Sequence, residues 1–209
     1  NMKNGVTDAL TTFNATNNDS LECIETLDPN YATANWTYAN GNIDVGVTFA
    51  DICYASNPSY TYVPDDNFEQ ALIDLGYDNV LDDYVITDSI SGVTTLNVNN
   101  DSISDLTGIE DFVSLTELEC ANNNLDSLDV SSNTALTYLN CGGNELTGLD
   151  VSSNTALTYL KFYNNELTSL DVSSNTALTN LQCWGNQLTS LDVSNNTGLP
   201  YLHCSSNQL

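Results

Sequence analysis

The segment from residue 115 to residue 209 consists of successive copies of one 21-residue repeat. Copies begin at residues 115, 136, 157, 178 and 199, and each opens with the pattern L-x-x-L-x-C-x-x-N-x-L, with Phe162 in the Cys position of the third copy. A fixed period of this length predicts a solenoid, in which each coil packs only against its neighbours. The length of such a chain measures its number of coils rather than the size of one globule.

The expected array begins one coil earlier and consists of coils at 93–114, 115–135, 136–156, 157–177 and 178–198 and a partial coil at 199–209. The second half of the first coil, DLTGIEDF, predicts a short 3₁₀ turn. In the later coils the second half, LxxLDVSxNTA, nearly repeats the first half. We therefore expect a short strand and an Asn-stabilised turn in both halves, little helix and a flat cross-section.

Two polar columns recur once per coil and are interpreted as structural. An inward amide can donate to the carbonyls of one coil and accept from the next, which satisfies backbone groups inside the stack. The first column is Asp101, Asn123, Asn144, Asn165, Asn186 and Asn207. The second column, expected at the opposite turn, is Asn133, Asn154, Asn175 and Asn196.

A third column consists of aspartates, whose like charges about 5 Å apart repel each other. Its members are Asp129, Asp150, Asp171 and Asp192. Either these carboxylates face solvent and accept turn N–H bonds, or a cation such as Ca²⁺ lies among them. The first alternative is favoured, because the chain contains no calcium-loop motif of the EF-hand type. No other metal and no cofactor is predicted.

The six cysteines form two groups. Four hold the same position in successive repeats, on parallel strands whose Cβ vectors suit disulfides poorly, and we interpret them as small buried apolar residues. They are Cys120, Cys141, Cys183 and Cys204. Cys23 and Cys53 lie outside the period and flank a loop with Trp and Tyr. We expect these two to form a disulfide worth about 3.5 kcal/mol, which requires an extracytoplasmic compartment.

The charge balance excludes two classes of partner. The chain has 28 acidic residues, two lysines and no arginine, which gives a formal net charge of −26. Such a polyanion cannot neutralise phosphates, so neither nucleic acid nor an anionic membrane surface is an expected partner. No apolar run approaches the ~18 residues of a membrane helix, so membrane insertion is not expected. No signal sequence opens the chain, and we expect that translation does not begin at residue 1.

The variable positions of each first strand are expected to line the concave face of the array. Tyr138, Tyr159 and Tyr201 share a column there. Exposed aromatic residues among amides and hydroxyls suit stacking against sugars or burial under a protein partner. The alternative is that tyrosine simply favours strand conformation. The candidate binding face is Tyr138, Tyr159, Lys161, Tyr163, Trp184, Tyr201 and His203.

The sequence does not predict an enzyme. His203 is the single histidine, so neither a catalytic triad nor a histidine metal site has a second member. The pairs Asp65/Asp66 and Asp82/Asp83 resemble the two carboxylates of a glycosidase. Acids adjacent in sequence are, however, typical of helix caps and solvated turns, and nothing in the sequence predicts a cleft around them.

Residues 1–55 predict the last coil and the C-terminal cap of a preceding array. The segment LTTFNATNN at 10–18 matches the repeat register, with Leu10, Phe13 and Ala15 at apolar positions and Asn18 at the Asn position. The open end of a solenoid core needs covering. The residues expected to cover it are Ile24, Tyr31, Trp36 and Phe49. Residues 56–63 contain small polar residues and Pro58 and are followed by Pro64, and they predict a linker.

Residues 64–92 predict a helical N-terminal cap for the second array. Asp66 is expected to be the N-cap of a short helix that buries Phe68, Leu72 and Leu75 and stops at Gly76. The apolar residues expected to complete this cap are Tyr77, Val80, Leu81, Tyr84, Val85 and Ile86.

Three phrases resemble secreted and cell-surface leucine-rich-repeat proteins of Bacteroidota, especially those of flavobacteria. They are the repeat LxxLxCxxNxLTxLDVSxNTA, the cap YVPDDNFEQALIDLGYDNVLDDYV and the segment LECIETLDPNYATANW. Coil 93–114 also resembles the 22-residue internalin type. The resemblance covers nearly the whole chain. It implies a β-rich leucine-rich-repeat solenoid with a short capping helix, exported by a type 9 system, and no catalytic residue.

The resemblance also implies an order of parts, in which the end of one array precedes the start of the next. We expect the chain to be cut from a longer polypeptide of tandem arrays. The resemblance further implies O-glycosylation, which in Bacteroidota occurs on exported proteins at Asp-Ser or Asp-Thr followed by an apolar residue or Thr. The sites that resemble this motif are Ser20, Ser89, Ser102 and Ser127.

Two functions are therefore expected for this secreted or cell-surface chain. The first is a non-enzymatic adhesive or structural role, as a segment of a long filament or stalk whose partners are neighbouring modules of the same or identical chains. The alternative is a binding module that holds a surface glycan or a protein on its concave, tyrosine-rich face.

Overall fold

The computed structural model describes residues 13–17, 23–25, 29–44, 47–50 and 59–209, which belong to two compact units divided between residues 58 and 59. Each unit is described by itself below. Within these described ranges no helix has the length and apolarity needed to cross a membrane.

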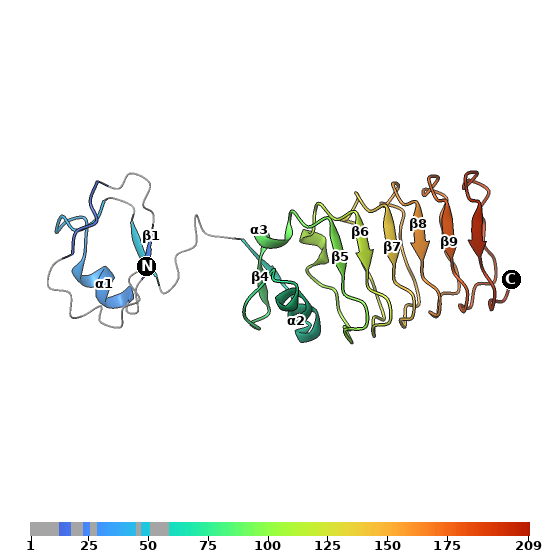
Figure 1. Ribbon diagram of the computed structural model, residues 1–209, viewed down its shortest axis with the longest axis horizontal. Helices are drawn as coiled ribbons and strands as arrows, with labels where there is room; N and C mark the ends of the chain where they lie inside the picture. The colour runs from blue at the N-terminus through green and yellow to red at the C-terminus, as the bar shows by residue number, and fades with distance from the viewer. Residues whose placement is uncertain (1–12, 18–22, 26–28, 45–46, 51–58) are drawn as a thin grey trace. The chain divides into compact units, whose positions relative to one another are not determined.

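The first unit contains the parallel strands β1 (Cys23–Glu25) and β2 (Thr48–Ala50) and the helix α1 (Pro29–Asn35) (Figure 1). Its apolar cluster is Ile24, Ile43 and Val47, with Phe13, Ala15 and Phe49 packed against it. Trp36 is buried, and its ring centroid lies 4.5 Å from that of Phe13 and 5.7 Å from that of Phe49. Tyr31 meets Trp36 edge-on at 6.0 Å.

Several predictions for this unit lie outside the described residues. These are Leu10, Asn18, Ser20, Cys53 and the side chain of Cys23, so the disulfide between Cys23 and Cys53 stays a prediction.

The second unit begins with a cap of β3 (Tyr60–Tyr62), α2 (Asp66–Asp74), β4 (Tyr84–Ile86) and α3 (Thr87–Ile90). Strands β3 and β4 pair antiparallel. The interpretation of residues 56–63 as a linker is therefore wrong from residue 59 onward. The prolines obscured a period of two in this segment, which buries Thr61 and Val63 and exposes Tyr60 and Tyr62.

Helix α2 also departs from its prediction. Its N-cap is Asp65 rather than Asp66, because Asp65 Oδ1 accepts the N–H groups of Asn67 at 2.9 Å and Phe68 at 3.0 Å. The helix ends at Asp74, so Leu75 lies beyond its last turn and is 46% exposed instead of buried.

The prediction of which apolar residues are buried in the cap is only partly right. Val85 is buried and Tyr77 packs against the core, whereas Val80, Leu81 and Tyr84 are about half exposed. The loop between α2 and β4 therefore turns Val80 and Leu81 outward while Tyr77 packs inward.

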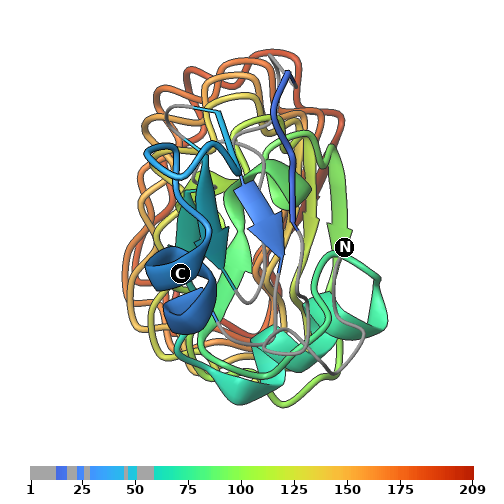
Figure 2. The same ribbon diagram turned by 90° about the vertical axis from the view of Figure 1, so that its left-hand side faces the viewer.

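The array follows as a six-stranded parallel sheet in the order β10-β9-β8-β7-β6-β5. Its strands are β5 (Thr95–Asn97), β6 (Glu117–Glu119), β7 (Tyr138–Asn140), β8 (Tyr159–Lys161), β9 (Asn180–Gln182) and β10 (Tyr201–His203). Equivalent repeat positions pair, as at Leu118 with Leu139 and Leu139 with Leu160. Seen end-on, the coils of this unit lie one behind another (Figure 2). The predicted 3₁₀ turn of the first coil is η2 (Ile109–Asp111).

The second half of each coil forms turns instead of the expected strand. Within the described array, its sheet pairing is limited to an isolated bridge between Asp129 and Asp150. The backbone bonds here run three residues back, as from Asn133 N–H to Val130 O at 3.0 Å and from Leu136 N–H to Asn133 O at 3.1 Å. These local bonds occupy donors that a strand would direct to its neighbour.

The first Asn column is an interior hydrogen-bond ladder. Asn144 Nδ2 donates to Cys120 O of the preceding coil at 3.1 Å and to Cys141 O of its own coil at 3.0 Å. Its Oδ1 accepts the N–H of Leu125 at 3.1 Å. Asn165, Asn186 and Asn207 repeat this set of bonds. Each amide thus joins two coils at a turn.

Asp101, predicted to head the ladder, does not take this role. Its side chain is exposed, and its backbone N–H donates to Asn123 Oδ1 at 3.1 Å. A carboxylate lacks the N–H donors with which an amide reaches two carbonyls.

The second Asn column is fully buried and donates in a similar way, as from Asn154 Nδ2 to Val130 O at 2.9 Å and to Asn133 O at 3.0 Å. In the described structure, the Oδ1 atoms of all four of its members are buried without a hydrogen-bond partner.

The residue before each ladder position has a left-handed backbone. These residues are Asn100, Asn122, Gly143, Asn164, Gly185 and Ser206. A Cβ on Gly185, whose φ is +69°, would collide with Asn164 Oδ1 of the preceding coil. Glycine therefore has two roles at this position: it adopts the left-handed backbone without strain, and it leaves room for the Asn164 side chain of the preceding coil.

Gly185→Ala is expected to lower the free energy of unfolding by about 1–3 kcal/mol, because it adds left-handed strain to the collision. Urea unfolding followed by circular dichroism measures the change. Gly198→Ala is the control, because its Cβ would meet no atom within 4 Å and its φ is not positive. Equal stability of the two variants would contradict the prediction.

Candidate binding face

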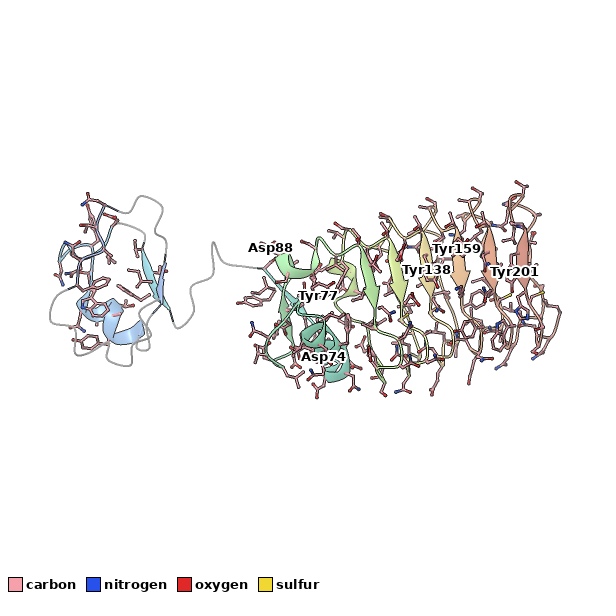
Figure 3. The ribbon with its side chains drawn as sticks, viewed as in Figure 1. Asp74, Tyr77, Asp88, Tyr138, Tyr159 and Tyr201 are labelled. Carbon is pink, nitrogen blue, oxygen red and sulfur yellow. The ribbon has the colours of Figure 1, made fainter. Side chains whose placement is uncertain are left out.

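The predicted tyrosine column lies along the strand side of the array (Figure 3). The rings of Tyr138 and Tyr159 are 6.0 Å apart, and Tyr159 is 43% exposed. Asn180 of β9 stands between Tyr159 and Tyr201 in the sheet register. The column therefore consists of one tyrosine pair and a separate, exposed Tyr201.

Lys161 is held against the tyrosine pair. Its Nζ donates to Tyr138 Oη at 2.9 Å and lies 4.9 Å from the centroid of the same ring. Since the chain has two lysines and no arginine, this side chain places a rare positive charge on an acidic molecule.

Tyr163, Trp184 and His203 form what we call the aromatic row, one ring from each of three successive coils. The rings of Tyr163 and Trp184 are 5.0 Å apart and nearly parallel, at 4°. Trp184 and His203 are 5.8 Å apart at 28°, and His203 Nε2 lies 2.9 Å from Ser205 Oγ. The sequence interpretation assigned these three residues to the binding face, and the structure adds that their rings contact one another.

The preceding coil leaves room for the first ring of the row. A Cβ on Gly142 would lie 2.5 Å from a ring carbon of Tyr163, so that ring rests directly over the glycine. Trp184 has Tyr163 on the coil before it and His203 on the coil after it. Tyr163 therefore lies between Gly142 and Trp184, and Trp184 lies between two other rings.

Threonines recur once per coil among the variable strand positions, and the sequence interpretation assigned them only to the expected concave face. Thr116, Thr137, Thr158 and Thr179 each donate their Oγ1 to the carbonyl of the equivalent threonine in the preceding coil, at 2.9–3.1 Å. Their strict 21-residue recurrence was the available signal, and it indicates a structural role beside the binding face.

The Asp column is exposed, and its carboxylates accept turn N–H bonds. Asp129 Oδ1 accepts the N–H of Ser131 at 2.9 Å, and Asp150, Asp171 and Asp192 make the equivalent bond. The Ser131 hydroxyl and then its N–H lower the pKa of Asp129. For Asp150 the N–H of Ser152 and then its hydroxyl lower the pKa. Local donors thus stabilise these charges, as the favoured alternative predicts.

The repeat cysteines are free thiols, of which Cys120, Cys141 and Cys183 are fully buried. Burial raises the pKa of Cys141 and of Cys183 to about 12. This agrees with their interpretation as apolar core residues, since a thiol is reactive as its thiolate.

The glycosylation candidates within the described chain, Ser89, Ser102 and Ser127, are exposed. The hydroxyl of Ser127 donates to Asp126 Oδ1 at 2.8 Å. Their modification stays a prediction.

No family model matches the chain. Internalin J of Listeria monocytogenes serotype 4b (strain F2365) is 45% identical over 73 residues, which are 35% of this chain and 8% of internalin J. The solved functional domain of InlJ from L. monocytogenes, described as including a cysteine ladder, has 34% identity and a TM-score of 0.55 over 72% of this chain and 44% of that chain. The array is a leucine-rich-repeat solenoid. Its homologues are bacterial proteins of the internalin type.

Two other leucine-rich-repeat similarities are informative. An internalin, inlF, of L. monocytogenes str. 4b F2365 has a TM-score of 0.60 at 25% identity over 71% of this chain and 45% of that chain. The LRIM1/APL1C complex matches with a TM-score of 0.55 at 27% identity, over 59% of this chain and 25% of that chain. The chain thus spans less than half the length of these three solved structures. The leucine-rich-repeat resemblance is confirmed, whereas the flavobacterial type stays a prediction.

Proposed function

We propose that the protein is a non-enzymatic, extracellular adhesion module that binds a protein partner through the aromatic row and the tyrosines beside it. The observation that supports this most directly is the row itself, in which three half-buried rings from successive coils stack on the strand side. Pre-arranged aromatic side chains lose little conformational entropy on binding and are frequent among the residues that dominate binding energy.

The geometry favours a protein over a glycan. A sugar ring stacks on an open aromatic face, but the faces of Trp184 are occupied by Tyr163 and His203. The half-buried stacked rings, with the amides of Asn180 and Gln182 on β9 of the same array, suit the apolar and amide groups of a protein surface. The LRIM1/APL1C match shows that this repeat architecture occurs in a complex of two named proteins.

The charge of the chain specifies the kind of partner. A formal net charge of −26 attracts a basic surface and repels an acidic one. Glu117 and Glu119 lie on β6, in the same sheet as the tyrosine pair. We therefore expect a basic protein partner, bound more weakly as salt increases.

Trp184→Ala is expected to weaken binding about 30-fold, as for a hot-spot residue of about 2 kcal/mol. Biolayer interferometry against purified basic extracellular proteins and a glycan panel, at low and high salt, measures this. Tyr38→Ala removes a tyrosine that is 65% exposed in the first unit and is the matched control, with an expected effect below about twofold. Binding confined to glycans, or retained by a folded Trp184→Ala variant, would contradict the proposal.

A second candidate function is that of a segment in a filament or stalk of tandem arrays. It is supported by the order of parts in one chain. The first unit has paired parallel strands and a cluster of Phe13, Trp36 and Phe49, and a new cap and array follow it. Electron microscopy of the native secreted product tests this idea, because a stalk should show the array repeating along its length.

A further inference from the structure

Three carboxylates from separate parts of the cap converge on one point. Asp66 and Glu69 lie in the first part of α2, and Asp83 immediately precedes β4. One oxygen from each carboxylate lies within 4.8 Å of the others. Asp66 and Asp83 are exposed, whereas Glu69 is fully buried beneath the surface.

The backbone holds this cluster in place. Glu69 Oε1 accepts the N–H groups of Asp82 at 2.9 Å and Tyr84 at 3.1 Å, the residues on either side of Asp83. Asp83 has a left-handed φ of 68°, and its carbonyl accepts the N–H of Val63 at 2.9 Å. The chain therefore brings Asp83 to Glu69 by a constrained turn rather than by a mobile side chain.

One oxygen of the buried carboxylate is unsatisfied. Glu69 Oε2 is buried without a hydrogen-bond partner among the described residues. A buried, unpaired carboxylate oxygen is costly, and two further carboxylates beside it add repulsion. Protein cations are scarce here, since Lys161 donates to Tyr138 in the array and Lys3 lies outside the described residues.

We propose that Asp66, Glu69 and Asp83 bind a calcium ion. The available donors are all carboxylate oxygens, which hard divalent cations prefer. Calcium bonds of about 2.3–2.6 Å let one ion span oxygens up to about 5 Å apart. Magnesium usually takes one or two carboxylates and keeps several waters, so three converging carboxylates favour calcium. The ion relieves the repulsion, and bidentate binding by Glu69 gives its Oε2 a partner.

The site ties the loop before β4 to α2, and both belong to the cover of the array. Phe68 and Leu72 of α2 and Val85 of β4 share one buried cluster with Leu96 and Leu118 of the first coils. Calcium is thus expected to stabilise the folded cap. Its Kd is expected in the submillimolar to millimolar range that is typical of extracellular calcium-binding modules. This inference does not depend on the proposed adhesion partner.

The test uses the whole chain, freed of metal with EDTA and dialysed, and titrated with CaCl₂ by calorimetry and in thermal melts. One calcium is expected to bind, and calcium at ten times the Kd should raise the melting midpoint by about 3–6 °C. Asp83→Asn should abolish both effects, because asparagine keeps a left-handed backbone but removes the charge. In EDTA the same variant should melt at or above the wild-type temperature, since a like charge is gone.

Two variants separate this site from general acidity. Asp74→Asn changes an exposed acid at the far end of α2, and Asp150→Asn changes the Asp column. Both should keep the calcium response. No heat and no thermal shift in the wild type, a response that survives Asp83→Asn, or a response to MgCl₂ in place of CaCl₂ would each overturn the proposal.

Discussion

Replacing Asn165 with leucine is expected to lower the free energy of unfolding by about 3–5 kcal/mol. Asn165 is 7% exposed, and its Nδ2 donates to Cys141 O and Phe162 O, both at 3.0 Å. Its Oδ1 accepts the N–H of Leu146 at 3.0 Å. Leucine has a similar volume but leaves three buried backbone groups unpaired, each at a cost of about 1–3 kcal/mol. Urea unfolding followed by circular dichroism measures the loss.

Asn207→Leu provides the matched control in the last coil. Asn207 makes the same bonds, to Cys183 O, Cys204 O and the N–H of Leu188, but it is only partly buried. Water can replace a lost bond at such a position, so the expected cost is about 1 kcal/mol. Equal losses at the two positions would show that burial does not set the strength of the ladder.

Phe68→Ala is expected to cost about 3–5 kcal/mol and to expose the end of the array. Phe68 is fully buried, and its ring centroid lies 6.3 Å from that of Phe112 in the first coil. Its removal leaves a cavity between α2 and the repeats, and a solenoid without its cap exposes apolar surface. Urea unfolding measures the loss, and increased binding of a hydrophobic dye reports the exposed core.

Leu75→Ala on the same segment is the control for this prediction. Leu75 is 46% exposed and lies beyond the last residue of α2, so its truncation should cost less than about 1 kcal/mol. A loss equal to that of Phe68→Ala would mean that the segment after α2 packs against the core after all.

The strand pairing and the interior residues of the array could be predicted from the sequence because the sequence repeats. Leu118, Leu139 and Leu160 pair across adjacent strands because a solenoid brings equivalent residues of successive coils together. The interior position of Asn144 followed from the same period, since a buried turn needs partners for its carbonyls. The prediction of a strand in the second half of the coil was wrong, because the same apolar spacing suits a strand and a series of tight turns.

The cap was harder to interpret because it has no period. Asp65 instead of Asp66 begins α2, and a strand at Tyr60–Tyr62 lies where a linker was expected. Adjacent aspartates and nearby prolines give ambiguous local signals. Tertiary packing resolves them by burying Val63 and by giving Asp65 Oδ2 the N–H of Ser104 at 2.8 Å.

The sequence by itself determined the solenoid, its coil boundaries and its interior amide ladder, because those contacts join residues one period apart. The tertiary structure alone decided that Tyr163, Trp184 and His203 stack into one row, because ring contacts depend on side-chain direction as well as register. It also decided that Asp66, Glu69 and Asp83 meet. Asp83 follows Glu69 by 14 residues with no repeating pattern between them, and the turn held by the bonds from Asp82 N–H and Tyr84 N–H to Glu69 Oε1 is what brings them together.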